Sequence, residues 1–280
     1  MKERPKKTLW QEFKKNPPLY IGLFLVFVLL LMAFFPSLFT SLSPTDIVAE
    51  AKLSPPSKEH IFGTDVYGRD VFARCVYGTI VDLKIGVIAM IVPLIMGTII
   101  GLLAGYYGGK FDMIVMRIVD IFTGFPFMVL VIAIVAILGT GLTNLYIAIW
   151  CVGWKEYARL VRSEVLVVKR MEYIDAARTM GFRDLRIILR HILPNVISGA
   201  IVYAASDIVL CMMSGASLSY LSLGVQPPTP EWGAIIAGGK NYISSAWWIT
   251  LFPGLFLMLA GLGFSLVGDG LSDALRNRGQ

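Results

Sequence analysis

The sequence is dominated by long apolar runs that contain few or no charged residues. A helix needs about 20 predominantly apolar residues to cross the hydrocarbon core of a bilayer. Five runs meet or approach this length, at residues 19–35, 85–107, 121–154, 196–223 and 246–267. The overall composition, 56% hydrophobic and 16% charged, also lies outside the range of ordinary soluble domains. The sequence therefore predicts an all-α, polytopic membrane protein.

The run at residues 121–154 is too long for one crossing and too short for two separate ones. The sequence Gly139-Thr-Gly-Leu-Thr-Asn144 supplies a turn inside it. A helical hairpin fits if its arms extend outward to about residues 113 and 161. With this hairpin we expect six transmembrane helices.

The distribution of basic residues predicts the orientation of these spans. Six crossings leave both termini on one side, and nineteen of the 25 Lys and Arg residues lie on that side when the N-terminus is inside. Cytoplasmic loops carry such an excess of Lys and Arg. We therefore expect both termini in the cytoplasm and the chain in the cytoplasmic (inner) membrane. The net charge of +6 follows mostly from this topology and does not indicate a nucleic-acid partner.

The spans divide the chain into a simple expected order of segments. These segments are a basic cytoplasmic segment at 1–18, a first transmembrane helix at 19–39, an outer loop at 40–82, a five-helix core at 83–275 that contains a cytoplasmic loop at 163–195, and a cytoplasmic tail at 276–280. Pro, Ser and Gly without a helical period fill the first outer loop, and prolines stiffen a second at 224–233.

The cytoplasmic segment between the fourth and fifth spans is much longer than a simple connection requires. Within its first half, Tyr173, Ala176, Ala177 and Met180 recur at helical spacing and predict a helix over residues 172–180 with one apolar stripe. Gly181 is able to end this helix in the left-handed conformation.

A second amphipathic helix is expected directly after this glycine, over residues 184–193. Leu185, Ile188, Leu189 and Ile192 recur there at the same spacing, and Pro194 is expected to break the run before the fifth span. The apolar stripe of this helix–Gly–helix–Pro unit must be covered by the spans of the chain itself or by another protein. An interfacial membrane helix is the simpler alternative.

Several separate motifs in this chain resemble one family, the binding-protein-dependent ABC transporter permeases. The first is Glu172-Tyr-Ile-Asp-Ala-Ala-Arg-Thr-Met-Gly181 with Ile192-Leu193-Pro194-Asn195, which resembles the Glu-Ala-Ala motif of that family, with Asp175 in the acidic position. The others resemble its peptide/nickel branch, most closely the C-type subunit of dipeptide and oligopeptide importers. They are Tyr157-Ala-Arg-Leu-Val-Arg162, Gly63-Thr-Asp-x-x-Gly-Arg-Asp70, Leu223-Gly-Val-Gln-Pro-Pro-Thr-Pro230 and Gly268-Asp-Gly-Leu-x-Asp-Ala-Leu275.

The resemblance implies a set of partners and a coupling role for the cytoplasmic loop. It implies a second, homologous permease in a heterodimer, two ATPase subunits below, a solute-binding protein outside, and ATP bound only by the ATPase subunits. The residues expected to couple to the ATPase are Glu172, Tyr173, Asp175, Ala176, Ala177, Arg178, Gly181 and Pro194. The outer residues expected to contact the binding protein are Arg69, Asp70 and Glu231.

The sequence offers little support for an enzyme. No Gly-x-x-x-x-Gly-Lys-[Ser/Thr] loop is present, since Gly109-Lys110 is followed by Phe111, so any ATP must be hydrolysed by another chain. The two histidines, His60 and His191, fall on opposite sides of the expected membrane, and no HExxH motif occurs. We therefore expect no catalytic site, no metal site and no bound cofactor in this chain.

Asp207 is the one acidic residue near the middle of an expected span, and it admits three interpretations. Intramembrane acids are costly and often functional, so it could belong to a proton relay in an ion-driven carrier. It could instead be hydrogen-bonded between helices. The resemblance adds a third interpretation, because many relatives carry a glutamate where this chain has Gly215, and Asp207 lies eight residues earlier. Asp207 and Gly215 are thus the candidate residues of the translocation path.

The substrate class stays open between peptides and nickel or metallophore complexes, all of which the branch handles. We expect peptides, because the spans lack the Cys and His density of a dedicated metal site. A stand-alone, ion-driven secondary transporter and a scaffold protein are the remaining alternatives.

Overall fold

The computed structural model describes residues 17–276, and this part of the chain is built from α-helices. The helices are α2 (Pro17–Phe34), α3 (Val71–Tyr107), α4 (Gly109–Thr123), α5 (Phe127–Leu138), α6 (Leu142–Val168), α7 (Glu172–Thr179), α8 (Asp184–Ile187), α9 (Leu193–Tyr220), α10 (Trp232–Gly239) and α11 (Trp248–Arg276). The predicted all-α class is confirmed. The basic segment expected at 1–18 and the tail at 276–280 lie almost entirely outside the described residues.

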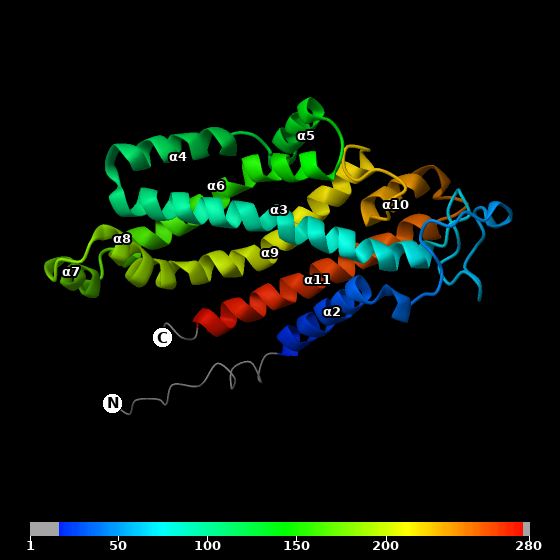
Figure 1. Cartoon of the computed structure of the whole chain (residues 1–280), viewed down its shortest axis with the longest axis horizontal. Helices are drawn as coiled ribbons and strands as arrows, with labels where there is room; N and C mark the ends of the chain where they lie inside the picture. Colours follow the sequence, from blue (N-terminus) through cyan, green and yellow to red (C-terminus); the bar gives the residue numbers. More distant parts are fainter. Residues whose placement is uncertain (1–16, 277–280) are drawn as a thin grey trace.

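Four long helices, α3, α6, α9 and α11, run along the long axis of the molecule, and α2 packs against α11 (Figure 1). The short helices α7 and α8 lie at one end of this bundle. The segment at residues 35–70 and α10 lie at the other end. The two regions that the sequence singled out as polar are therefore separated by the full length of the bundle.

By length and composition, four helices in the described part of the chain are able to cross a membrane, or five if the α4–α5 pair counts as one broken span. The pair bends by 87° at residues 124–126, where Pro126 precedes α5. The sixth expected crossing corresponds to α6, whose 27 residues exceed the required length. Its second half carries charged residues such as Lys155, Arg159 and Arg162, so α6 is long enough to cross but is less apolar than the other four helices.

The last part of the expected outer loop at 40–82 is helical, because α3 begins at Val71. The Asp70 carboxylate accepts a hydrogen bond of 2.7 Å from the Ala73 amide and so caps the first turn. Residues 71–82 therefore belong to this helix, and the segment between α2 and α3 spans residues 35–70. The expected 246–267 span is also longer in the structure, since α11 covers Trp248–Arg276.

Glycines allow α3 and α6 to approach closely. Gly97, Gly101 and Gly105 face α6 at four-residue spacing, and a Cβ added to Gly101 would come within 2.6 Å of the Ala158 carbonyl oxygen. Small residues at this spacing are typical of helices that pack in membranes. The contact fixes α3 and α6 against each other.

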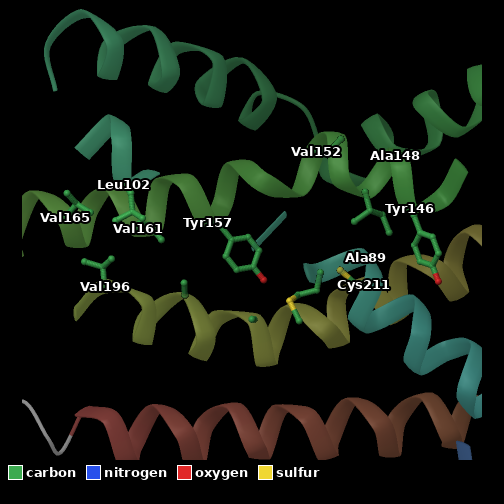
Figure 2. Close-up of a cluster of buried hydrophobic side chains, with 14 of the residues drawn as sticks. Ala89, Leu102, Tyr146, Ala148, Val152, Tyr157, Val161, Val165, Val196 and Cys211 are labelled. Carbon is green, nitrogen blue, oxygen red and sulfur yellow. The ribbon is translucent and has the colours of Figure 1, made fainter. Parts of the chain in front are cut away.

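A buried apolar cluster continues this packing toward α9. Figure 2 shows Tyr157, Val161 and Val165 of α6 along the strip that faces α9, with Val196 and Cys211 on the facing helix. The same cluster includes Ile174 and Ala177 of α7 and Ile187, Ile188 and Ile192 of the segment that follows. The loop expected at residues 163–195 is thus packed against the core of the bundle.

Candidate coupling site

Helix α7 carries its charges where the helix dipole favours them. Glu172 and Asp175 lie in the first turn and Arg178 in the last. The Arg178 guanidinium also lies 3.3 Å from the exposed Asp175 carboxylate. The predicted helix over residues 172–180 is confirmed, with its last turn ending at Thr179.

The apolar stripe predicted for this helix divides between two faces. Ile174 and Ala177 are buried in the core cluster, whereas Tyr173, Ala176 and Met180 are exposed. Placing Ala177 with the other three on one face was therefore incorrect, because the helix packs on its own bundle through Ile174 and Ala177. This packing leaves a second apolar face uncovered.

Gly181 ends α7 as predicted, with a left-handed backbone at φ +77°. Its amide donates to the Arg178 carbonyl, and the Phe182 amide donates to the Ala177 carbonyl. These two bonds form a Schellman motif, which satisfies carbonyls at a helix end and reverses the chain direction. A Cβ at Gly181 would meet no atom within 4 Å, so backbone conformation alone selects glycine here.

The second amphipathic helix differs from the prediction. Only Asp184–Ile187 is α-helical, Ile188–Ile192 forms a π-helical turn, and α9 follows without a break. Pro194 lies in the first turn of α9, directly after the π-helical turn. The expectation that Pro194 breaks the chain before the fifth span is therefore wrong. The segment enters α9 as one continuous helical body.

The loop is fastened to the end of α3 as well as to α9. The Tyr106 hydroxyl of α3 donates a 2.6 Å hydrogen bond to the Asp184 carboxylate, and the Arg178 guanidinium lies 5.6 Å from the Tyr106 ring centroid. The Lys169 ammonium donates to the Gly105 carbonyl at 2.7 Å. Sequence reasoning missed Tyr106 because its partner lies 78 residues away and no local pattern links them.

Large apolar side chains remain exposed over the loop. They are Met171, Tyr173, Met180, Leu185 and Leu189, and their exposed fractions lie between 45% and 65%. We call these five residues the coupling surface. They lie at the end of the bundle opposite the 35–70 segment (Figure 1). Exposed apolar side chains gathered on one loop in this way are typical of a contact with a protein or a membrane.

At the opposite end of the bundle, two of the three residues expected to contact a binding protein serve the fold. Asp70 caps α3 and also lies 2.8 Å from the ring nitrogen of His60. Glu231 is fully buried and caps α10 by accepting bonds from the Gly233 and Ala234 amides. Burial raises the pKa of the Glu231 carboxyl above its usual value, and the hydrogen bonds from these two amides offset only part of this rise. Only Arg69 keeps part of its side chain at the surface.

Asp207 and Gly215 both lie on α9 but in different surroundings. The Tyr157 hydroxyl of α6 donates a 2.8 Å hydrogen bond to the Asp207 carboxylate, and Figure 2 shows the Tyr157 side chain between these helices. Gly215 is packed against α3, where an added Cβ would lie 2.5 Å from the Ile85 Cγ2 atom. The hydrogen bond from Tyr157 thus supports the interpretation that Asp207 is hydrogen-bonded between helices.

Among the described residues, no group of three or more His, Cys, Asp or Glu side chains could hold a metal ion. The free thiols of Cys75, Cys151 and Cys211 lie in the described part of the chain. The polar groups that do converge make hydrogen bonds and ion pairs between helices, as Arg162 of α6 does with Asp112 of α4. The candidate site is therefore the coupling surface at one end of the bundle.

Two family models match this chain. The family described as "Binding-protein-dependent transport system inner membrane component" matches residues 97–278, and "N-terminal TM domain of oligopeptide transport permease C" matches residues 5–56. The chain belongs to the binding-protein-dependent transport permeases. It is accordingly an integral membrane subunit of a transport system, as its resemblance to that family implied.

Curated relatives agree with this assignment over nearly the whole chain. It is 44% identical to the dipeptide transport system permease protein DppC of Alkalihalophilus pseudofirmus, over 97% of this chain and 89% of the relative. It is 39% identical to the glutathione transport system permease protein GsiD of Pectobacterium atrosepticum, with 98% and 93% covered. It is 40% identical to the probable D,D-dipeptide transport system permease protein DdpC of Escherichia coli, with 96% and 90% covered.

A solved structure supports the fold. The chain is similar to a chain of the MetNI methionine ABC transporter in an inward-facing conformation, with a TM-score of 0.59 and 20% sequence identity. The match covers 72% of this chain and 95% of that one. The helical arrangement of this permease is therefore that of a known ABC transporter membrane subunit.

Proposed function

We propose that this permease is the C-type subunit of an ATP-driven importer of peptides in the cytoplasmic membrane. The coupling surface carries the proposal. An exposed apolar surface on a rigid loop at one end of a transmembrane bundle is suited to dock against another protein. In a binding-protein-dependent system that protein would be the ATPase subunit.

The loop has the construction that force transmission requires. The Schellman turn at Gly181 fixes the angle between α7 and α8, and the π-helical turn joins α8 to α9 without a flexible linker. The bond from Tyr106 ties the same loop to α3. A displacement of α7 by a closing ATPase dimer would therefore move α3 and α9 together, which is the rocking of helical bundles that alternating access needs.

Each residue of the motif takes a part in this proposal. Tyr173, Ala176 and Met180 would contact the ATPase, with Glu172, Asp175 and Arg178 as polar contacts around them. Ala177 would hold α7 on the bundle, and Gly181 and Pro194 would shape the turns at the two ends of the loop.

The proposed assembly contains a second, homologous permease, two ATPase subunits and an extracytoplasmic solute-binding protein. The basic residues support an orientation with both termini in the cytoplasm. ATP would be bound and hydrolysed by the ATPase subunits, and this chain would bind no cofactor.

Peptides are the proposed substrate, because the relatives carry names that refer to dipeptide, D,D-dipeptide and glutathione transport. Nickel or metallophore complexes are the second candidate, from the branch that the motifs resemble. Uptake of labelled dipeptides and of nickel in a deletion strain separates the two. Loss of peptide uptake with intact nickel uptake is expected, and the reverse result would overturn the peptide assignment.

A reconstitution experiment tests the function itself. Proteoliposomes that contain the two permeases and the ATPase subunits should take up peptide only when ATP and the binding protein are present. Uptake by this chain alone, driven by a pH gradient, would instead establish an ion-driven carrier that uses Asp207. A deletion strain with normal uptake of every substrate would favour a scaffold role.

A further inference from the structure

A cavity of about 300 Å³ opens at the end of the bundle that holds the 35–70 segment. Three separate parts of the chain line it: the segment that leads into α3, the connection after α9, and α10, which Figure 1 shows side by side at this end. Its size falls at the lower limit of small-molecule sites, which measure roughly 300–1,000 Å³.

The charges that line this cavity are unbalanced. Arg69, Arg74 and Lys240 contribute three cations, and Asp65 contributes the one carboxylate among the lining residues. Asp65 is already committed, because its Oδ2 atom accepts from the Arg69 Nε atom at 2.7 Å and its Oδ1 atom accepts from the Tyr67 and Arg69 amides. Among the residues that line the cavity in the described part of the chain, positive charges therefore outnumber negative ones.

Arg74 is a buried cation whose hydrogen-bonding capacity is not fully used. Its side chain is only 3% exposed, its Nη1 atom donates to the Pro44 carbonyl at 3.2 Å, and its Nε atom has no hydrogen-bond acceptor among the described residues. The Asp65 Oδ2 atom lies 3.7 Å from that Nε atom, too far for a good hydrogen bond. A buried guanidinium with an unmet donor favours an anion nearby.

The remaining lining is mixed. Polar side chains such as Ser219, Ser222 and Gln226 lie beside apolar ones, and α11 adds Ile249 to the three segments. Val225, Ile235 and Ile249 are buried side chains that border the cavity beside the cations. A ligand that fills both parts has a carboxylate joined to an apolar group within a few bonds. The C-terminal residue of a peptide has this composition, and arginine pairs with its carboxylate through two parallel hydrogen bonds.

We propose that this cavity binds the C-terminal residue of a peptide at the outer face of the permease, with the carboxylate held by Arg69, Arg74 and Lys240. The inference rests on the proposed function as a peptide importer and adds a substrate subsite to it. The subsite would hold a peptide released by the binding protein before the peptide enters the translocation path.

The probes are alanyl-leucine and its C-terminal amide, which differ only in the anionic group. Binding is measured by saturation-transfer NMR on the permease in nanodiscs with its partner permease and ATPase subunits, without the binding protein. We expect saturable binding of the free acid and about tenfold weaker binding of the amide, because one charge-assisted interaction is lost. Equal binding of the two probes, or no saturable binding of the acid, would overturn the proposal.

Lys240→Gln is the main variant, because the Lys240 side chain lines the cavity and is exposed. Its ammonium lies over the Tyr220 ring, so the substitution leaves no buried charge without a partner. It should weaken binding of the acid about tenfold and leave binding of the amide unchanged. The matched control is Lys52→Gln, an exposed lysine of the same outer region that does not line the cavity, and it should bind both probes as the wild type does.

An ATP-driven uptake assay with the binding protein separates the possible failures. Normal peptide uptake without carboxylate binding would reject the subsite and leave the importer function standing. Lys240→Gln could instead raise only the concentration of binding protein needed for half-maximal uptake. The cavity would then receive an acidic side chain of that protein, and its assignment to the C-terminal residue of a peptide would be wrong. Absence of any ATP-driven peptide uptake would reject the proposed function itself.

Discussion

The hydroxyl of Tyr106, in the last turn of α3, donates a 2.6 Å hydrogen bond to the carboxylate of Asp184, the first residue of α8. This bond joins the longest helix of the bundle to the loop that carries the coupling surface. Tyr106 is 8% exposed, whereas its neighbour Tyr107 is 57% exposed. Two adjacent tyrosines thus differ in whether they restrain the loop, which makes them a matched pair for mutation.

Tyr106→Phe is expected to loosen the coupling loop without unfolding the protein. The substitution keeps the ring beside Arg178 and removes a hydrogen bond to a charged group, worth about 1.5–3 kcal/mol. The reconstituted importer should then hydrolyse ATP at a near-normal rate and transport less peptide per ATP. Both rates are measured in the same proteoliposomes, with Tyr107→Phe as the control. A transport ratio that falls equally in both variants would show that the bond to Asp184 does not serve coupling.

Substitutions of Gly181 are expected to rank by their tolerance of a left-handed backbone. The residue has φ +77° and free space around its Cβ position, so only conformational strain opposes a side chain. Gly181→Asn should be mild, and Gly181→Ala should cost about 1–2 kcal/mol. Gly181→Pro fixes φ near −65° and cannot form this turn. We expect it to leave the transmembrane bundle folded and to abolish transport-coupled ATP hydrolysis.

The same series checks whether the effect is local. Thermal unfolding of the purified complex reports on the bundle, and ATP hydrolysis stimulated by the binding protein reports on the loop. A bundle that unfolds in Gly181→Pro, or coupling that survives in it, would contradict a role for this turn in transmission.

Local signals made part of the coupling site predictable from the sequence. The helical period and Gly181 together defined α7 to within one residue of its observed end, because helix formation and helix capping depend on neighbours in the chain. The period also placed Tyr173, Ala176 and Met180 on a common stripe. It did not separate the face that packs on the bundle, at Ile174 and Ala177, from the face left exposed.

Features that depend on distant segments were not predictable. Asp70 is an exception, because its cap on the amide of Ala73 is a local feature that the sequence could have shown. The burial of Glu231 depends on the packing of α10 between α3, α9 and α11. The π-helical turn before α9 has no sequence signature of comparable strength, so Pro194 was taken as a break.

Gly101→Ala is expected to destabilise the permease through the α3–α6 contact. The new Cβ would lie 2.6 Å from the Ala158 carbonyl oxygen, and a backbone atom cannot move aside as a flexible side chain can. Separating two packed helices costs about 1–3 kcal/mol. The control is Gly254→Ala in α11, where a Cβ would meet no atom within 4 Å. That change should be neutral or should stabilise by about 0.4–1 kcal/mol. Thermal unfolding in one detergent measures both, and equal unfolding temperatures would contradict the close packing of these helices.

Tyr157→Phe and Asp207→Asn are expected to differ, because they change the two ends of one hydrogen bond in different ways. The amide introduced by Asp207→Asn would keep an oxygen that accepts from the Tyr157 hydroxyl, whereas Tyr157→Phe would leave the Asp207 carboxylate without its 2.8 Å donor. Tyr157→Phe should therefore destabilise the protein by about 1–3 kcal/mol, and Asp207→Asn by less. Uptake assays on both variants then separate the roles of the acid. If Asp207 serves only to join α6 and α9, peptide uptake follows stability, and Asp207→Asn transports better than Tyr157→Phe. A stable Asp207→Asn variant that fails to transport would instead assign the carboxylate to the translocation path.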